Sequence, residues 1–202
     1  IYAGLGTDLV LGDVGQFVWT PEGVLTSALT FDYDESRAGS DDILMLSAIP
    51  SSDQNNKGLG EHVVTTDLDS YFTDSDRSGD NNVALGGTGN DSITTGSGID
   101  WVVGDFGEFT WTTEGVITAF SSTDVATRNV AGLVVGGDDV IDAGHGDNFV
   151  IGGAGADRIL SGDGDDVLAG DHVMLDFTDA GVAILMETLD TLNSDGGDDL
   201  IN

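Results

Sequence analysis

Gly86-Gly87-Thr88-Gly89-Asn90-Asp91-Ser92-Ile93-Thr94 is the stretch that decides the fold, and Thr95-Gly96-Ser97-Gly98-Ile99-Asp100-Trp101-Val102-Val103 follows it without a gap. Both nonapeptides fit one frame, with glycines among the first four positions, aspartate at position six and an apolar residue at position eight. The frame returns at 3–11, 143–151, 152–160 and 161–169, with asparagine in place of aspartate at position six of 143–151. A fixed period of this kind indicates stacked structural units, so the sequence predicts a repeat fold.

Each nonapeptide divides into a turn and a short strand. Glycine tolerates positive φ, so the first six residues can turn sharply. The last three then form a strand that buries its middle side chain, and two nonapeptides make one coil that pairs in parallel with the next. The residues predicted to be buried at position eight are Val10, Ile93, Val102, Val150, Ile159 and Leu168.

Position six lies where each turn meets its strand. Stacking of coils predicts the pairs Asn82 with Asp100, Asp139 with Asp157, and Asn148 with Asp166. Stacked carboxylates repel each other unless a cation lies between them. Ca²⁺ accepts 6–8 oxygen ligands in flexible geometry, and glycine-rich turns can direct carbonyl oxygens toward it. The sequence therefore predicts several bound Ca²⁺ ions.

The charge balance supports bound cations and excludes several classes of protein. Asp and Glu number 37 against 5 Lys and Arg, a formal net charge of -32, yet 39% of the residues are hydrophobic. Such a chain repels nucleic acid and anionic membrane surfaces, and no apolar run could span a bilayer. The absence of cysteine excludes a disulfide scaffold. No catalytic motif is present, so we expect no enzymatic activity.

A longer repeat interrupts the nonapeptides after Asp8, Asp100 and Asp166. Each excursion alternates apolar and polar residues around a glycine turn, at Gly23, Gly115 or Gly181, which predicts three β-hairpin insertions. Trp19, Trp111 and Phe177 recur in these hairpins, either as a ligand-binding stripe or, as we favour, packed on the flank of the coils or between hairpins. Aspartates recur at a constant spacing and are candidates either for calcium ligands at the hairpin base or for turn caps: Asp13 with Asp32, Asp105 with Asp124, and Asp171 with Asp190.

These repeats divide the chain into modules. Residues 1–44, 78–136 and 137–202 each combine a coil segment with one hairpin, and 45–77 is an irregular insertion. Asp74 and Asp76 in that insertion resemble the start of a calcium loop, although the glutamate and the helix of an EF-hand are missing. Because both ends interrupt the pattern, we expect the array to continue beyond them.

The nonapeptides resemble the RTX (haemolysin-type) calcium-binding repeat. The resemblance implies an all-β fold, a parallel β-roll (a right-handed β-solenoid), here interrupted by the three hairpins. It also implies calcium ligands at position six, together with turn carbonyls. One implied site combines Gly137, Asp139, Gly152, Ala154 and Asp157, and a second combines Gly144, Gly146, Asn148, Ser161, Asp163 and Asp166. The asparagine at 148 removes one charge from the second site. The remaining candidate ligands are Asp8, Asp42, Asn82, Asp91, Asp100 and Asp199.

The resemblance also implies a function. RTX proteins are exported by type I secretion and fold on meeting extracellular calcium, so we expect a secreted or cell-surface location. The favoured role is a structural module of an adhesin, surface layer or extracellular filament, with neighbouring modules, copies of itself or a surface ligand as partners. The alternatives are an accessory domain of a secreted protease, lipase, epimerase or toxin, and a calcium store or mineral binder.

Overall fold

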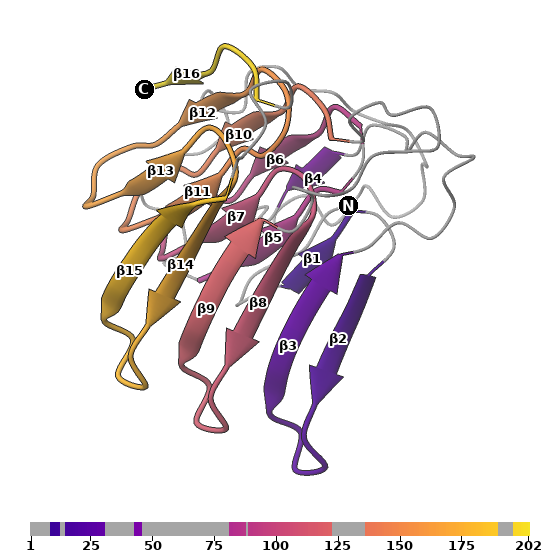
Figure 1. Ribbon diagram of the computed structural model, residues 1–202, viewed down its shortest axis with the longest axis vertical. Coiled ribbons are helices and arrows are strands. Elements are labelled where there is room, and N and C mark those ends of the chain that lie inside the picture. The colour runs from indigo at the N-terminus through magenta and orange to yellow at the C-terminus, as the bar shows by residue number, and fades with distance from the viewer. Residues whose placement is uncertain are drawn as a thin grey trace, which may run out of the picture.

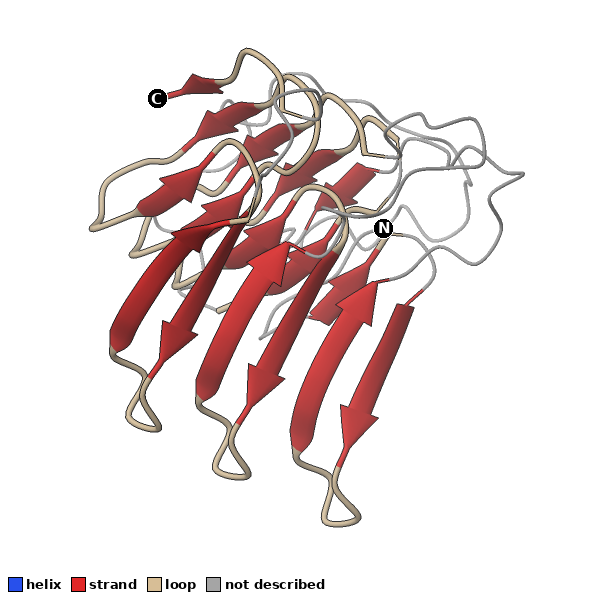
Figure 2. Cartoon of the chain, in the orientation of Figure 1, coloured by secondary structure: helices blue, strands red, loops and turns tan. Residues whose placement is uncertain are grey.

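The computed structural model describes residues 9–12, 15–30, 43–45, 81–87, 89–122, 136–189 and 196–202. Within these ranges the chain consists of strands and turns and contains no helix (Figure 2). The all-β prediction is therefore confirmed for the described part of the chain. Accordingly, none of the described residues belongs to a helix of the length and apolar character needed to cross a membrane.

Ten short strands form two parallel sheets (Figure 1). The first parallel sheet contains, in spatial order, β1 (Leu9–Leu11), β5 (Val83–Leu85), β7 (Trp101–Val103), β11 (Phe149–Ile151) and β13 (Val167–Ala169). The second parallel sheet contains β16 (Leu200–Ile201), β12 (Arg158–Leu160), β10 (Val140–Asp142), β6 (Ser92–Thr94) and β4 (Ile43–Met45). From β5 onward, when the hairpin strands are set aside, each strand of one parallel sheet is followed in the chain by a strand of the other.

The register keeps each nonapeptide position aligned through the stack. In the first parallel sheet Val83 pairs with Trp101, Trp101 with Phe149, and Phe149 with Val167, and all four residues occupy position seven. Position eight of each strand then faces the opposite parallel sheet. Val10, Ile93, Val102, Val150 and Ile159 are at most 6% exposed there, and Leu168 packs against them, as predicted from the sequence. Ala84, Ile141 and Ala143 complete this core.

Three hairpins form a third, antiparallel sheet. Its strands are, in spatial order, β15 (Ala183–Thr188), β14 (Val173–Phe177), β9 (Ile117–Ser122), β8 (Gly107–Trp111), β3 (Leu25–Thr30) and β2 (Gly15–Trp19). The glycine at each hairpin tip has φ between 76° and 88°, a conformation that suits glycine. The sequence predicted three hairpin insertions, and in the structure neighbouring hairpins also pair with each other, through β3 with β8 and β9 with β14.

A second apolar core lies between the antiparallel sheet and the first parallel sheet. Trp101 stacks on Phe149 with 4.0 Å between ring centroids and meets Phe120 and Phe177 edge to face. Of the three recurring aromatic residues, Phe177 and Trp111 belong to this core, whereas Trp19 is 53% exposed. Two of the three therefore pack on the flank of the coils, and the hairpins form a cover over one face of the first parallel sheet.

Candidate metal centre

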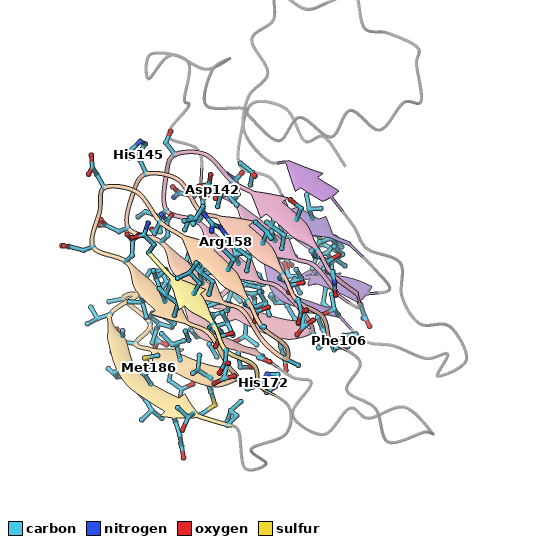
Figure 3. The ribbon with its side chains drawn as sticks, turned by 90° about the horizontal axis from the view of Figure 1, so that it is seen from above. Phe106, Asp142, His145, Arg158, His172 and Met186 are labelled. Atoms are coloured by element: carbon cyan, nitrogen blue, oxygen red, sulfur yellow. The ribbon has the colours of Figure 1, made fainter. Side chains whose placement is uncertain are left out.

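The turns between the two parallel sheets form two stacks on opposite sides of the strands. The hairpin-side stack leads from the first parallel sheet to the second, and the plain-side stack leads back. In Figure 3 Phe106 and His172, at the hairpin bases, lie across the molecule from His145, which is in a plain-side turn. The plain-side turns are 95–100, 143–148 and 161–166, and the hairpin-side turns include 86–91 and 152–157.

Among the described residues, two hairpin-side turns are split by a hairpin yet keep the nonapeptide geometry. Gly104 and Asp105 occupy positions one and two, and the chain returns after the hairpin at Gly136, which takes position three. Gly137 stacks between Gly89 and Gly155, which both occupy position four of their own turns. A Cβ on Gly137 would collide with the carbonyl oxygen of Gly89, and a Cβ on Gly155 would collide with that of Gly137, so Gly137 also occupies position four. The hairpin is therefore inserted between positions two and three. The turn of 170–171 with 196–199 has the same design.

Aspartates at position six form a ladder through the hairpin-side stack. The Asp91 N–H donates to Oδ1 of Asp139 at 2.8 Å, and the Asp139 N–H donates to Oδ1 of Asp157 at 2.8 Å. The Asp157 N–H donates to Oδ1 of Asp199 at 2.9 Å. Asp91, Asp139 and Asp157 are at most 2% exposed. This hairpin-side ladder thus stacks carboxylates alone.

Asparagine and aspartate alternate in the plain-side ladder. The Asn82 N–H donates to Oδ1 of Asp100 at 2.8 Å, the Asp100 N–H to Oδ1 of Asn148 at 3.1 Å, and the Asn148 N–H to Oδ1 of Asp166 at 2.9 Å. The Asn82 side-chain amide also donates to Oδ1 of Asp100 at 2.9 Å. Each step of this ladder therefore contains one carboxylate and one neutral amide.

The three pairs predicted from the sequence are neighbours in these ladders, each separated by 18 residues. The sequence reasoning missed the pairs Asp91 with Asp139 and Asp100 with Asn148, which are 48 residues apart, and Asp157 with Asp199, which are 42 apart. A hairpin intervenes in each case. The sequence did contain a signal for these pairs. Gly-Asp precedes each hairpin and Gly-Gly-Asp-Asp follows two of them, and these two short patterns are the halves of one turn.

The second carboxylate oxygens point into the turns. Oδ2 of Asp100, Asp139 and Asp157 is buried and has no hydrogen-bond donor within the described chain. A Cβ on Gly104 would collide with both Oδ2 of Asp139 and the carbonyl oxygen of Gly152. At Gly152 the same holds for Oδ2 of Asp157 and the carbonyl oxygen of Gly170. Buried acceptors that converge without a donor are unfavourable unless a cation joins them.

Burial also changes the acidity of these groups. Burial raises the pKa of Asp157 to about 7, and repulsion from Asp199, Asp138 and Asp171 adds to the effect. The pKa of Asp139 is likewise raised, by burial first and then by the charges of Asp157, Asp91 and Asp138. In the plain-side ladder burial raises the pKa of Asp100, while hydrogen bonds from Thr95 and Asn82 oppose the rise. The carboxylate form is therefore disfavoured most where carboxylates stack on one another.

Glycines at positions two and four bring turn carbonyls close together. In the plain-side stack a Cβ on Gly144 would collide with the carbonyl oxygen of Gly96, and one on Gly146 with that of Gly98. Both glycines have positive φ, at 68° and 120°. The turns therefore supply stacked carbonyl oxygens beside the position-six side chains. Hard oxygen donors of this kind, with one or two carboxylates, suit Ca²⁺.

The two implied calcium sites differ in what the structure shows of them. In the site of Gly137, Asp139, Gly152, Ala154 and Asp157, Oδ2 of Asp139 and the carbonyl oxygen of Gly152 converge on Gly104. In the site of Gly144, Gly146, Asn148, Ser161, Asp163 and Asp166, the Asn148 amide instead donates to the carbonyl oxygen of Gly146 at 3.1 Å. Asn148 thus reduces the charge of the second site and also hydrogen-bonds to one of its implied ligands.

Asp105 closes the split turn. Its Oδ1 accepts the N–H of Gly137 at 3.0 Å, its Oδ2 accepts the N–H of Ala154 at 2.6 Å, and the residue is fully buried. The carboxylate thereby connects the two ends of the insertion with the next coil. This geometry favours the turn-capping alternative for Asp105. Asp171 occupies the equivalent position, where its Oδ1 lies against Gly196.

Within the described ranges, no three His, Asp or Glu side chains meet in a group that could hold a metal ion. The candidate sites instead combine two position-six side chains with turn carbonyls. Asp8, Asp13, Asp32, Asp42, Asp74, Asp76, Asp124 and Asp190 lie outside the described residues, so their predicted roles stay predictions.

Comparison with known protein families agrees with this geometry. The RTX calcium-binding nonapeptide repeat matches in four copies, over residues 77–108 and 135–170. These ranges contain the position-six residues from Asn82 to Asp166 that the structure describes. RTX nonapeptide repeats bind Ca²⁺, and the donor set of both ladders fits that ion. Neither the curated proteins nor the solved structures give a match to this chain.

Proposed function

The chain contains RTX calcium-binding nonapeptide repeats, and on this basis we propose that it is a structural module of a secreted or cell-surface RTX-type protein. In this proposal the two parallel sheets form a calcium-loaded β-roll, and the antiparallel sheet covers one of its faces. The role is that of a scaffold in an adhesin, a surface layer or an extracellular filament. It involves no catalysis by this chain.

The observation that carries the proposal is the hairpin-side ladder. Asp139 and Asp157 are buried and stacked at position six, and the Oδ2 of each is an acceptor that no donor of the described chain reaches. Of the five lysines and arginines, Arg158 alone lies in the described ranges, so cationic side chains there cannot neutralise the ladder. A divalent ion that binds the folded turns and not the unfolded chain would stabilise the fold by mass action.

The calcium concentration then controls folding. Extracellular calcium modules bind with a dissociation constant on the order of 10⁻⁴–10⁻³ M, far above cytosolic calcium. Inside a cell the chain would remain unfolded through charge repulsion, which suits export as an extended chain. Outside, millimolar calcium would fill the sites and complete the fold. Calcium also replaces the disulfides that many small exported domains use, because this chain has no cysteine.

The antiparallel sheet supports a scaffold rather than a simple secretion signal. The hairpins pair through β3 with β8 and β9 with β14, so successive modules share one continuous cover. Forces applied along the stack would be resisted by three sheets at once. We therefore favour the scaffold role over that of a short accessory domain.

Circular dichroism during a calcium titration tests this function. We expect disordered spectra in chelator and a cooperative gain of β-structure at millimolar Ca²⁺. Magnesium is the matched control, because it requires stricter octahedral geometry and should produce much less structure at equal concentration. A chain that is fully folded in chelator, or that magnesium folds equally well, would contradict the proposal.

A further inference from the structure

In the described part of the chain, the antiparallel sheet contains one strand more than the first parallel sheet beneath it. The first parallel sheet has five strands and the antiparallel sheet has six. When the two strand orders are counted from the edge formed by β1 and β2, β2 and β3 match β1 and β5, and β8 and β9 match β7 and β11. For the third hairpin β14 corresponds to β13, whereas β15 has no counterpart among the described strands. Figure 1 shows β15 at the left edge of the antiparallel sheet.

The inward face of β15 is exposed as a result. Ala28, Phe120 and Met186 occupy equivalent positions, because each pairs across its hairpin with the same partner position, at Phe17, Phe109 and Leu175. Ala28 and Phe120 are fully buried, whereas Met186 is 51% exposed. Ala183, which pairs with the inward-facing Phe177, is exposed as well. Met186 is labelled on the outermost, yellow strand in Figure 3.

The plain-side ladder ends at the same place. Each position-six residue in it donates its N–H to the position-six side chain of the next coil, and Asp166 is the last acceptor. Each position-six carbonyl likewise accepts the N–H of the next strand in the sheet, as Asn148 does from Val167 at 2.8 Å. If a further strand lay beside β13, the N–H of Asp166 could donate to the position-six side chain before that strand, and the Asp166 carbonyl oxygen could accept the N–H of that strand, as in the coils before it.

We propose that β13, β15 and Asp166 form a docking seat for one uninterrupted nonapeptide, with an acidic or amide residue at position six and large apolar residues at positions seven and nine. Its strand lies parallel to β13 and covers Met186 and Ala183 on the inward face of β15. The proposal deepens the scaffold role and rests on it, because the occupant is another repeat of the same kind.

Topology argues against the first coil of a second copy as the occupant. In this chain β1 leads directly into β2, the first strand of its own hairpin. If β1 of a second copy paired with β13, its β2 would need the position that β15 already holds. A nonapeptide without a hairpin, like the one that ends in β11, avoids this conflict. Two copies in direct end-to-end contact would leave the place under β15 unfilled.

The test is a chain with nine additional residues after Asn202. These residues copy Ala143–Ile151, which follow β10 as the seat requires them to follow β16. The matched control carries the same nine residues with serine at the two positions that copy Phe149 and Ile151. Hydrogen exchange by mass spectrometry, in saturating calcium, measures protection of the β13 and β15 amides in both and in the chain itself.

We expect the added nonapeptide to slow exchange in β15 at least about tenfold, and the serine control to have no such effect. Met186→Ser should abolish the gain in the extended chain and change little in the chain itself. Equal protection in the extended chain and the control would overturn the proposal, and so would a dimer of the unextended chain, detected by light scattering, that protects β15. Calcium-induced folding of the unextended chain is measured separately, so failure of the proposed function would be distinguishable.

Discussion

The hairpin-side and plain-side ladders have the same backbone geometry but different chemistry. Both pass an N–H from position six of one coil to the side chain of the next, over distances of 2.8 to 3.1 Å. The described hairpin-side ladder uses aspartate at every step, whereas the plain-side ladder alternates asparagine with aspartate. One stack therefore gathers negative charge, and the other dilutes it with amides.

This difference shows that position six has two separable roles. Its Oδ1 accepts a backbone N–H, which an asparagine oxygen does as well as a carboxylate. Its second side-chain atom distinguishes aspartate from asparagine. Oδ2 of Asp139, like that of Asp100, has no donor in the described chain, whereas the Asn148 amide donates to the carbonyl oxygen of Gly146. We infer that the hairpin-side ladder makes folding depend on calcium, and that the plain-side ladder holds its shape with weaker metal binding.

Acidification in chelator should give the largest effect. The folded-state pKa of Asp157 is raised to about 7, above its unfolded value of about 3.9. A raised pKa in the folded state adds stability that is full below the unfolded pKa and is lost as the pH rises through the folded one. The metal-free chain should therefore gain β-structure as the pH falls from 7 toward 4, as measured by circular dichroism.

The control for that experiment is Asp139→Asn together with Asp157→Asn. These asparagines do not titrate, so the gain of structure on acidification should shrink. An unchanged pH profile in the double variant would show that the two buried carboxyl groups are not responsible.

The next largest effect is expected from replacing a position-six side chain by alanine. In saturating calcium Asp139→Ala should lower the free energy of unfolding by about 3–5 kcal/mol, because it leaves buried charges uncompensated. Asn148→Ala, the matched variant in the plain-side ladder, should cost only about 1–3 kcal/mol, the effect of lost hydrogen bonds. Urea denaturation measures both. Equal losses would mean that the two ladders are energetically alike.

Asp105→Ala tests the closure of the split turn. Loss of this carboxylate leaves the buried N–H groups of Gly137 and Ala154 without their acceptor, so stability should fall by about 2–4 kcal/mol. Native mass spectrometry should count the same number of calcium ions as in the original chain. Loss of one ion would instead assign Asp105 to a metal site at the hairpin base.

The smallest effect is expected when one asparagine of the plain-side ladder is replaced by the aspartate that the hairpin-side ladder has at this position. Asn148→Asp should strengthen calcium binding at the plain-side site by about 1–2 kcal/mol, because it adds a carboxylate and frees the Gly146 carbonyl oxygen. In chelator the same variant should be less stable than the original chain. Calorimetric calcium titration measures the first effect, and a variant that binds calcium no better would break the proposed distinction.

Much of the candidate site could be predicted from the sequence because the turn is local. Glycines at positions two and four, the acceptor at position six and the apolar residue at position eight all act within one nonapeptide. The pairs separated by one coil followed directly from the period. Partners separated by a hairpin, such as Asp91 and Asp139, were missed because the insertion hides the period while the three-dimensional stack preserves it.

The amino-acid sequence by itself determined the repeat, its short strands, its hairpins and its need for a divalent cation. These features follow from backbone freedom at glycine, from burial at one position in nine and from the charge of stacked aspartates. Only the tertiary structure decided that the hairpins pair into one sheet, that Asp105 bridges a split turn and that no described strand lies beneath β15. Those outcomes depend on contacts between coils distant in the chain, which no local pattern encodes.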